Sequence, residues 1–92
     1  MDKTFFTTIE DRRKAFAERA GITVEDVRAE LLLGSGRTYF LEQVIEAGDG
    51  WVHLDVRDMI GEQDLHSIVL PYYQITHLMF IKHKVRVPGF AR

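Results

Sequence analysis

The chain contains no cysteine among its 92 residues. Disulfides, thiol catalysis and cysteine-ligated zinc sites are therefore excluded, and this composition fits a reducing compartment. No apolar run approaches the roughly 18 residues that a membrane-spanning helix needs. Residues 1–6 also lack the apolar stretch and the small-residue cleavage site of a signal peptide. These absences predict a cytoplasmic protein without a membrane partner.

The chain also has little excess charge of either sign. It has 12 Lys and Arg residues and 14 Asp and Glu residues, so its formal net charge is −2. It therefore has no overall basic field that would attract nucleic acid. The charge is unevenly placed, because an acid-free segment near the C-terminal end contains Lys82, Lys84, Arg86 and Arg92. This segment is either a local contact for a polyanion or a solvated edge strand with solubilising side chains.

The composition is nevertheless that of a folded domain. Hydrophobic residues make up 46% of the chain and aromatic residues 11%, so the chain can bury a core. A chain of this length has room for one core only, and such a core stabilises the fold marginally. We therefore expect a single domain, for which oligomerisation would add stability.

Residues 8–20 have the pattern of an N-terminal helix. Thr7 and Thr8 are each followed three residues later by an acid, as in a capping box at the start of a helix. Gly21 ends the helix, because glycine adopts the left-handed conformation of a helix C-terminus at low cost. The apolar face of this helix must pack against the rest of the protein, and it consists of Ile9, Phe16 and Ala20.

Residues 22–33 fit two interpretations. Thr23 and Asp26 could cap a second helix, in which Val24, Val27 and Leu31 would share one face. With a period of two, residues 27–33 instead alternate as a strand, and the glycines at 34 and 36 form a hairpin turn into the next strand. We predict the strand from Val27, because the segments that follow are strands.

The remainder of the chain predicts four more strands separated by turn signals. The segments are rich in β-branched and aromatic residues or alternate between polar and apolar positions. An Asp-Gly pair marks the hairpin turn at residues 47–50, and a single proline marks a one-turn corner at residues 71–74. The predicted strands cover residues 38–46, 51–57, 65–70 and 75–85.

Residues 27–81 resemble the Sm-like family of small β-proteins. Residues 27–31 followed by Gly36-Arg37 look like the opening hairpin of that family. Asp49 followed by the alternating residues 51–56 resembles the first Sm motif, and residues 68–75 resemble the second. The resemblance implies a mainly β fold with an N-terminal helix at residues 8–20. It also implies an Sm-like or SH3-like, five-stranded, strongly bent antiparallel barrel at residues 27–85 and a tail at residues 86–92.

The motifs depart from the family pattern at the positions that recognise RNA. His53 occupies the place of an Asn that reads a base edge in Sm proteins. Leu70-Pro71 or Pro71-Tyr72 replaces the family's Arg-Gly pair, and Tyr72-Tyr73 replaces the Lys-His pair of bacterial Hfq. The resemblance therefore supports the fold more strongly than it supports the RNA site.

In the Sm-like family, subunits join edge to edge into rings, and the pore between the two motif turns binds single-stranded RNA. The resemblance thus implies a homo-oligomeric ring as partner and RNA as ligand, without an enzymatic activity. Aromatic side chains at the pore would stack on bases, and basic residues of the last strand would contact phosphates. The implied RNA-binding residues are Asp49, Trp51, His53, Tyr72, Tyr73, Lys82, Lys84 and Arg86.

A second interpretation needs no nucleic acid. Tyr72 and Tyr73 could fill the seam between subunits, Trp51 could pack at the barrel rim, and His53 could be an ordinary surface histidine. The chain would then be an SH3-like protein-interaction or assembly module, which its mild acidity favours.

Catalysis, metals and cofactors are not expected from the sequence. Ser35 and Ser67 are the only serines, and neither lies in a nucleophile elbow. The four histidines lack the spacing of a ligand pair on a helix, and no acidic segment has the spacing of a calcium loop.

Overall fold

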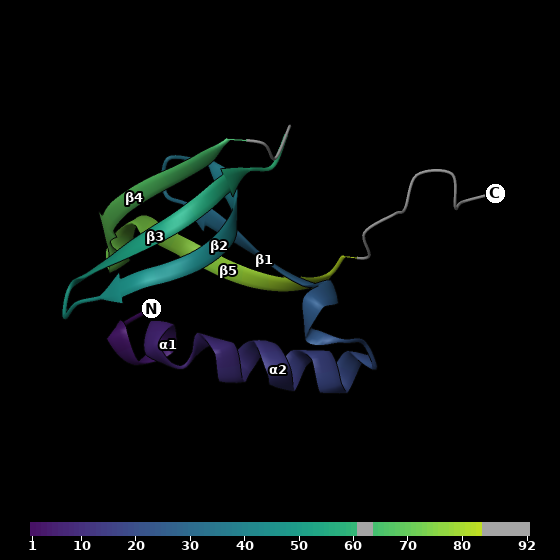
Figure 1. The fold of residues 1–92 in the computed structure, drawn as a ribbon. Coiled ribbons are helices and arrows are strands. Elements are labelled where there is room, and N and C mark those ends of the chain that lie inside the picture. The colour runs from purple at the N-terminus through teal and green to yellow at the C-terminus, as the bar shows by residue number, and fades with distance from the viewer. Residues whose placement is uncertain (61–63, 84–92) are drawn as a thin grey trace.

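The computed structural model describes residues 1–60 and 64–83 (Figure 1). Two helices, α1 (Lys3–Thr7) and α2 (Ile9–Ala20), precede a single antiparallel sheet of five strands. The strands lie in the order β4-β3-β2-β1-β5, so the predicted mainly β architecture is confirmed, with two N-terminal helices in place of the single one predicted. Their bounds are β1 (Val27–Leu33), β2 (Thr38–Ala47), β3 (Trp51–Asp58), β4 (Leu65–Pro71) and β5 (Ile75–Lys82).

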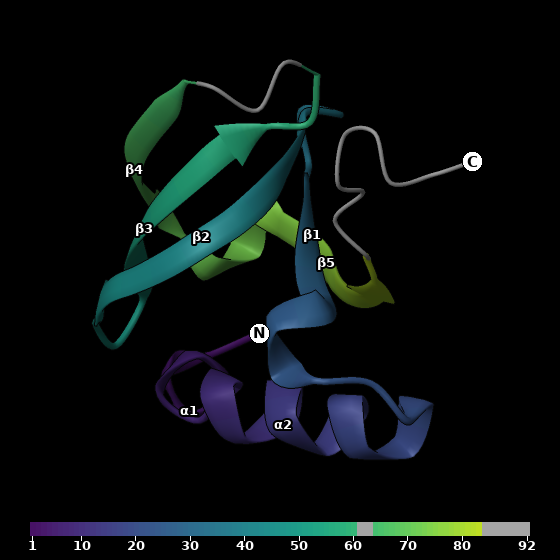
Figure 2. The same cartoon turned by 45° about the vertical axis from the view of Figure 1, so that its right-hand side comes forward.

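The sheet is open within the described part of the chain. β4 pairs with β3 alone, and β5 pairs with β1 alone, so both strands are edges. Figure 2 shows α1 and α2 lying along one side of this sheet, with the strands curving above them. The five strands and their antiparallel pairing match the prediction, whereas closure into a barrel is not observed.

The N-terminal helix differs from the prediction at its start. Helical structure begins at Lys3, with a break at Thr8, and the Asp2 carboxylate caps α1 by accepting a hydrogen bond from the Phe5 amide at 2.9 Å. The predicted capping box is absent, because residues before Thr8 are already helical. The Thr8 hydroxyl instead donates to the Thr4 carbonyl oxygen at 2.7 Å, a bond that competes with capping. The predicted end is correct, since Gly21 has a φ of 71°.

Residues 22–33 are a strand preceded by one short helical turn. Residues Val24–Asp26 form a 3-10 helix, η1, and β1 begins at Val27 as predicted. Val27, Ala29 and Leu31 are buried in the core, as a period of two requires. Of the second helix that residues 22–33 could also have formed, only the single turn at Val24–Asp26 is present.

The remaining boundaries agree with the sequence to within about a residue. β2, β3 and β4 each extend one residue beyond the predicted segment, and the corner after β4 is the 3-10 turn η2 (Tyr72–Gln74). β5 ends at Lys82, and His83 lies outside the strand. The predicted strand end at residues 84–85 and the tail at residues 86–92 lie outside the described residues.

The core is formed by the concave side of the sheet and a side chain from α1. Val52, Leu54 and Val56 of β3 are completely buried, in agreement with their alternation in the sequence. Phe6 of α1 is also buried, and its ring stacks on Tyr72 with centroids 5.7 Å apart. Helix and sheet thus share one core, and Tyr72 connects that core to the turn between β4 and β5.

Candidate functional site

Two turns that the sequence resemblance assigns to motifs meet at one end of the sheet. These are the β2–β3 turn at residues 48–50 and η2. Tyr72 joins them, because its amide donates to the Gly50 carbonyl oxygen at 3.2 Å and its hydroxyl donates to the Gly48 carbonyl oxygen at 2.7 Å. Trp51 and Pro71 are paired next to these bonds. We call the surface formed by Asp49, Trp51 and Tyr73 the aromatic end.

Trp51 is held at the aromatic end by a glycine. The indole lies so close to Gly48 that a Cβ at that position would collide with Cε2 and Nε1 of Trp51. The Trp51 side chain remains 39% exposed, so part of its ring is open to solvent. Packing at the rim and contact with a ligand are therefore compatible roles for this residue.

The two adjacent tyrosines have different environments. Tyr72 is 7% exposed, whereas Tyr73 is 83% exposed. Burial raises the pKa of the Tyr72 phenol, and the nearby carboxylates of Asp2 and Asp49 raise it further. Tyr72 is therefore a core residue in this chain, and Tyr73 is the member of the pair that presents its ring to solvent.

The aromatic end is not basic. The Asp49 carboxylate is almost fully exposed, and its ion pair is with Lys3, at 3.5 Å. An ion pair this exposed contributes little to stability. A ligand would therefore be attracted here by stacking more than by charge.

His53 lies on the face of β3 away from the core. Its Nε2 is 2.6 Å from the Ser67 hydroxyl of β4, and His53 is paired with Val69 in the sheet register. Val69 is 63% exposed, so this face combines a polar pair with an apolar side chain. No pattern in the sequence links His53 to Ser67, and only the pairing of β3 with β4 brings them together.

The predicted basic residues do not join the aromatic end. Lys82 pairs with Val27 at one end of β5. The other end, at Ile75, follows η2 at the aromatic end, and the two ends are about 23 Å apart at the usual rise per residue of a strand. Lys84 and Arg86 lie outside the described residues. The structure thus brings the turns that carry Asp49, Trp51 and Tyr73 to one end of the sheet, places His53 two residues beyond Trp51 on β3, and separates Lys82 from them.

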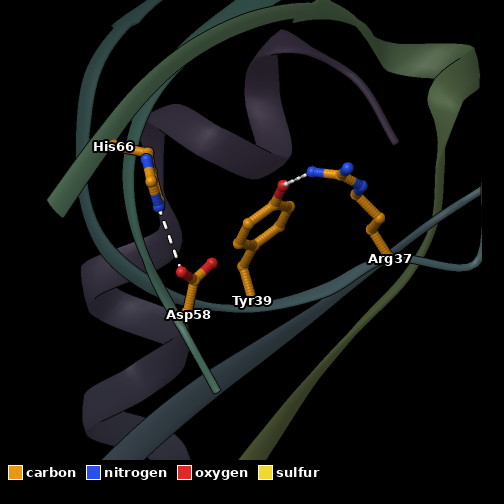
Figure 3. Close-up of polar contacts among 4 residues, drawn as sticks. All are labelled: Arg37, Tyr39, Asp58 and His66. Carbon is orange, nitrogen blue, oxygen red and sulfur yellow. Dashed lines mark hydrogen bonds and ion pairs between the residues drawn. The ribbon is translucent and has the colours of Figure 1, made fainter. Parts of the chain in front are cut away.

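A second polar cluster lies at the opposite end of the sheet, and the sequence did not predict it (Figure 3). Figure 3 shows the Arg37 guanidinium pointing at the Tyr39 hydroxyl, to which it donates at 3.2 Å, and the His66 ring pointing at Asp58. The His66 Nε2 and an Asp58 carboxylate oxygen are 3.2 Å apart. The Tyr39 and His66 rings pack edge to face, with centroids 6.4 Å apart.

This cluster connects β2, β3 and β4 near their ends. The hydrogen bond to Tyr39 raises the pKa of Arg37, whose guanidinium is charged at any physiological pH, and Asp58 raises it slightly more. Asp58 and His66 are both nearly half exposed, so their ion pair is weak. The available signal in the sequence was the Gly36-Arg37 turn with Tyr39 two positions later, but Asp58 and His66 come from strands β3 and β4.

Two further observations limit the chemistry of residues 1–60 and 64–83. No group of three His, Asp or Glu side chains in these ranges could hold a metal ion. No helix in the same ranges has the length and apolarity to cross a membrane.

Comparisons with protein-family models, with curated proteins and with solved structures found no match to this chain.

Proposed function

We propose that this chain is a non-enzymatic Sm-like protein that assembles edge to edge into a ring and binds single-stranded RNA at the aromatic end. In this proposal, strands β4 and β5 of neighbouring copies complete the bent barrel. The observation on which it rests is the position of these two strands at the open edges of the sheet, next to the exposed ring of Tyr73.

The sheet edges support the assembly. Unpaired edge strands present rows of amide and carbonyl groups that tend to pair with another chain. Leu65 and Val69 of β4 are 52% and 63% exposed, and Met79 of β5 is 45% exposed. Pairing of β4 in one copy with β5 in the next would satisfy both edges and cover these apolar side chains. Repeated head-to-tail contacts of this kind form a ring when the rotation closes.

The exposed aromatic side chains support RNA as the ligand. Every base has a flat face, and stacking on an aromatic side chain contributes roughly 1–3 kcal/mol per base. Tyr73 and the open part of Trp51 provide such faces in each copy. A ring would repeat this weak site around one axis, so that a single strand could contact several copies at once.

The experiment combines native mass with RNA binding. Light scattering on a sizing column measures the mass, and fluorescence anisotropy measures the affinity for short U-rich and A-rich RNA at low salt, where phosphate contacts are strongest. Tyr73→Ala should weaken RNA binding by about fivefold or more, because one stacking contact per copy is lost. Tyr73→Phe keeps the ring and serves as the matched control.

Two results would contradict the proposal. The first is absence of RNA binding at low salt by a protein of the assembled mass. The second is dissociation of the assembly by Tyr73→Ala, because this residue would then belong to the seam between subunits.

One observation favours a second candidate, a protein-interaction module that does not bind nucleic acid. The carboxylates of Asp2 and Asp49 both act on Tyr72 at the aromatic end, and Lys3 is the basic partner there. A negatively charged backbone is not attracted to such a surface. This candidate predicts the same native mass, indifference to RNA at any salt concentration, and capture of a protein partner that Tyr73→Ala releases.

A further inference from the structure

A cavity of about 430 Å³ lies between α2 and the sheet, and its lining residues differ from those of the aromatic end and of the Arg37 cluster. It is formed where two neighbouring strands diverge. β1 pairs with β2 only through residues 30–32, whereas residues 27–29 pair with β5. Residues 41–44 of β2 pair with β3 instead. Helix α2 covers the opening between them.

The volume is that of a small-molecule site, and the lining combines an apolar wall with several charged groups. Pockets that bind small ligands typically measure about 300–1,000 Å³ and combine apolar walls with a few polar groups. The apolar wall here includes Ile9 of α2, Val27 and Ala29 of β1, and Leu41 and Val44 of β2. It would suit a short aliphatic group.

The charged groups of the lining balance one another. Three arginines and three glutamates line the cavity. Arg57 donates from Nε to Glu42 at 2.7 Å, so these two charges are already paired. An anionic ligand would leave the cavity with a net negative charge. A ligand that has one positive and one negative group would leave it neutral.

Arg13 of α2 lines this cavity with a partly exposed side chain. One of its terminal nitrogens donates to the Val24 carbonyl oxygen at 3.0 Å, and the other is 3.8 Å from the Glu10 carboxylate. The contact with Glu10 is longer than a hydrogen bond, and the Arg13 side chain is 27% exposed. Its guanidinium can therefore still pair with a carboxylate in the cavity.

Glu25 supplies the complementary charge. It follows Val24 in η1, so the hydrogen bond from Arg13 to Val24 holds η1 beside α2. Glu25 lines the same cavity, and it is exposed. One guanidinium and one carboxylate are thus held next to the apolar wall.

From these contacts we infer that the cavity binds an aliphatic α-amino acid. Its carboxylate pairs with the guanidinium of Arg13, its ammonium group contacts Glu25, and its side chain packs against Val27, Ala29 and Leu41. Arginine suits the first role because its planar donors match a carboxylate. The bound amino acid would connect α2 to the sheet and stabilise the fold by mass action. This inference does not depend on RNA binding or on assembly.

The test uses the full chain and L-leucine as the probe. The midpoint temperature of thermal unfolding should rise with millimolar L-leucine. The amide chemical shifts of residues in α2, η1 and β1 should change in NMR spectra. Leucinamide, which lacks the carboxylate, and 4-methylpentanoate, which lacks the ammonium group, should each bind at least about tenfold more weakly. Inorganic phosphate at the same concentration should have no effect.

Three variants locate the site. Arg13→Gln and Glu25→Gln should each weaken L-leucine binding about tenfold or more, and Glu25 is exposed enough for its variant to fold normally. Arg19→Gln removes the same charge from the end of α2, outside the cavity lining, and should bind as the parent does. The inference is wrong if L-leucine does not bind, if 4-methylpentanoate or phosphate binds equally well, or if Glu25→Gln binds as tightly as Arg19→Gln.

Discussion

At the scale of single residues, the aromatic end depends on how one turn orients two neighbouring tyrosines. η2 directs Tyr72 into the core, where Phe6 covers one face of its ring, and leaves Tyr73 in solvent. The buried hydroxyl is satisfied by the Gly48 carbonyl oxygen, as buried polar groups generally are. Identical side chains at consecutive positions therefore have different roles, one in stability and one on the surface.

Tyr72→Phe should lower the free energy of unfolding at pH 7 by about 1 kcal/mol, because it removes the hydrogen bond to Gly48 and keeps the ring. It should also change the alkaline behaviour. The folded protein raises the pKa of Tyr72 above its usual value of about 10. The stabilisation linked to its protonation is complete below about pH 10 and is lost as the pH rises through the folded pKa.

Urea denaturation at neutral and alkaline pH measures both effects. Tyr73→Phe is the matched control and should leave the free energy of unfolding unchanged, since this ring is exposed. An alkaline loss of stability that is equally steep in Tyr72→Phe and in the parent would contradict the assignment.

At the scale of elements, α1 exists because of its tertiary contacts. A helix of five residues is too short to be stable alone in water. Its stability comes from the Asp2 cap and from Phe6, which is buried against Tyr72. The break at Thr8 then allows α2 to take its own direction and to cover the opening between β1 and β2.

Phe6→Ala should reduce the free energy of unfolding by about 3–5 kcal/mol, because the substitution leaves a cavity between α1 and the sheet. Thr7 in the same helix is exposed, so Thr7→Ala should change the free energy of unfolding by about 0.5 kcal/mol or less. Urea denaturation followed by Trp51 fluorescence compares the two. Equal effects of the two substitutions would mean that α1 does not contribute to the core.

At the scale of the whole molecule, the open sheet is the feature that most needs a partner. Among residues 1–60 and 64–83, the central strands β1, β2 and β3 have neighbours on both sides, and the two edge strands have a neighbour on one side only. Exposed edges in natural proteins are usually protected by charge, by bulges or by pairing. β4 and β5 instead expose Leu65, Val69 and Met79, which is the pattern expected of strands that associate.

A pair of matched variants tests this expectation. Met79→Glu places a charge on edge strand β5, and Ile45→Glu places one on the interior strand β2, at a residue with the same 45% exposure. Met79→Glu should weaken assembly by about tenfold or more, and Ile45→Glu should not. Light scattering over a range of concentrations reports the mass. A parent protein that stays monomeric, or equal effects of both variants, would contradict edge-to-edge assembly.

The sequence predicted most of the fold because the signals involved are local. Alternation over residues 51–57 places Val52, Leu54 and Val56 in the core. Gly21 and Gly36, with φ of 71° and 92°, end α2 and form part of the β1–β2 turn by backbone conformation alone. The predicted start of the helix was wrong, because α1 is stabilised by a contact between Phe6 and Tyr72, which lies 66 positions further along the chain. The capping pattern at Thr8 involves only residues three positions apart, so it contains no information about a contact with Tyr72.

The sequence by itself determined the strands, the turns and the place where the two motif turns bend the chain, because side-chain periodicity and glycine conformation act over a few residues. Only the tertiary structure decided which residues share a site. Pairing of β3 with β4 brought His53 to Ser67, the end of the sheet gathered Arg37, Tyr39, Asp58 and His66, and the divergence of β1 from β2 opened the cavity beside Arg13. These groupings depend on strand register and on burial, which arise from contacts between distant parts of the chain.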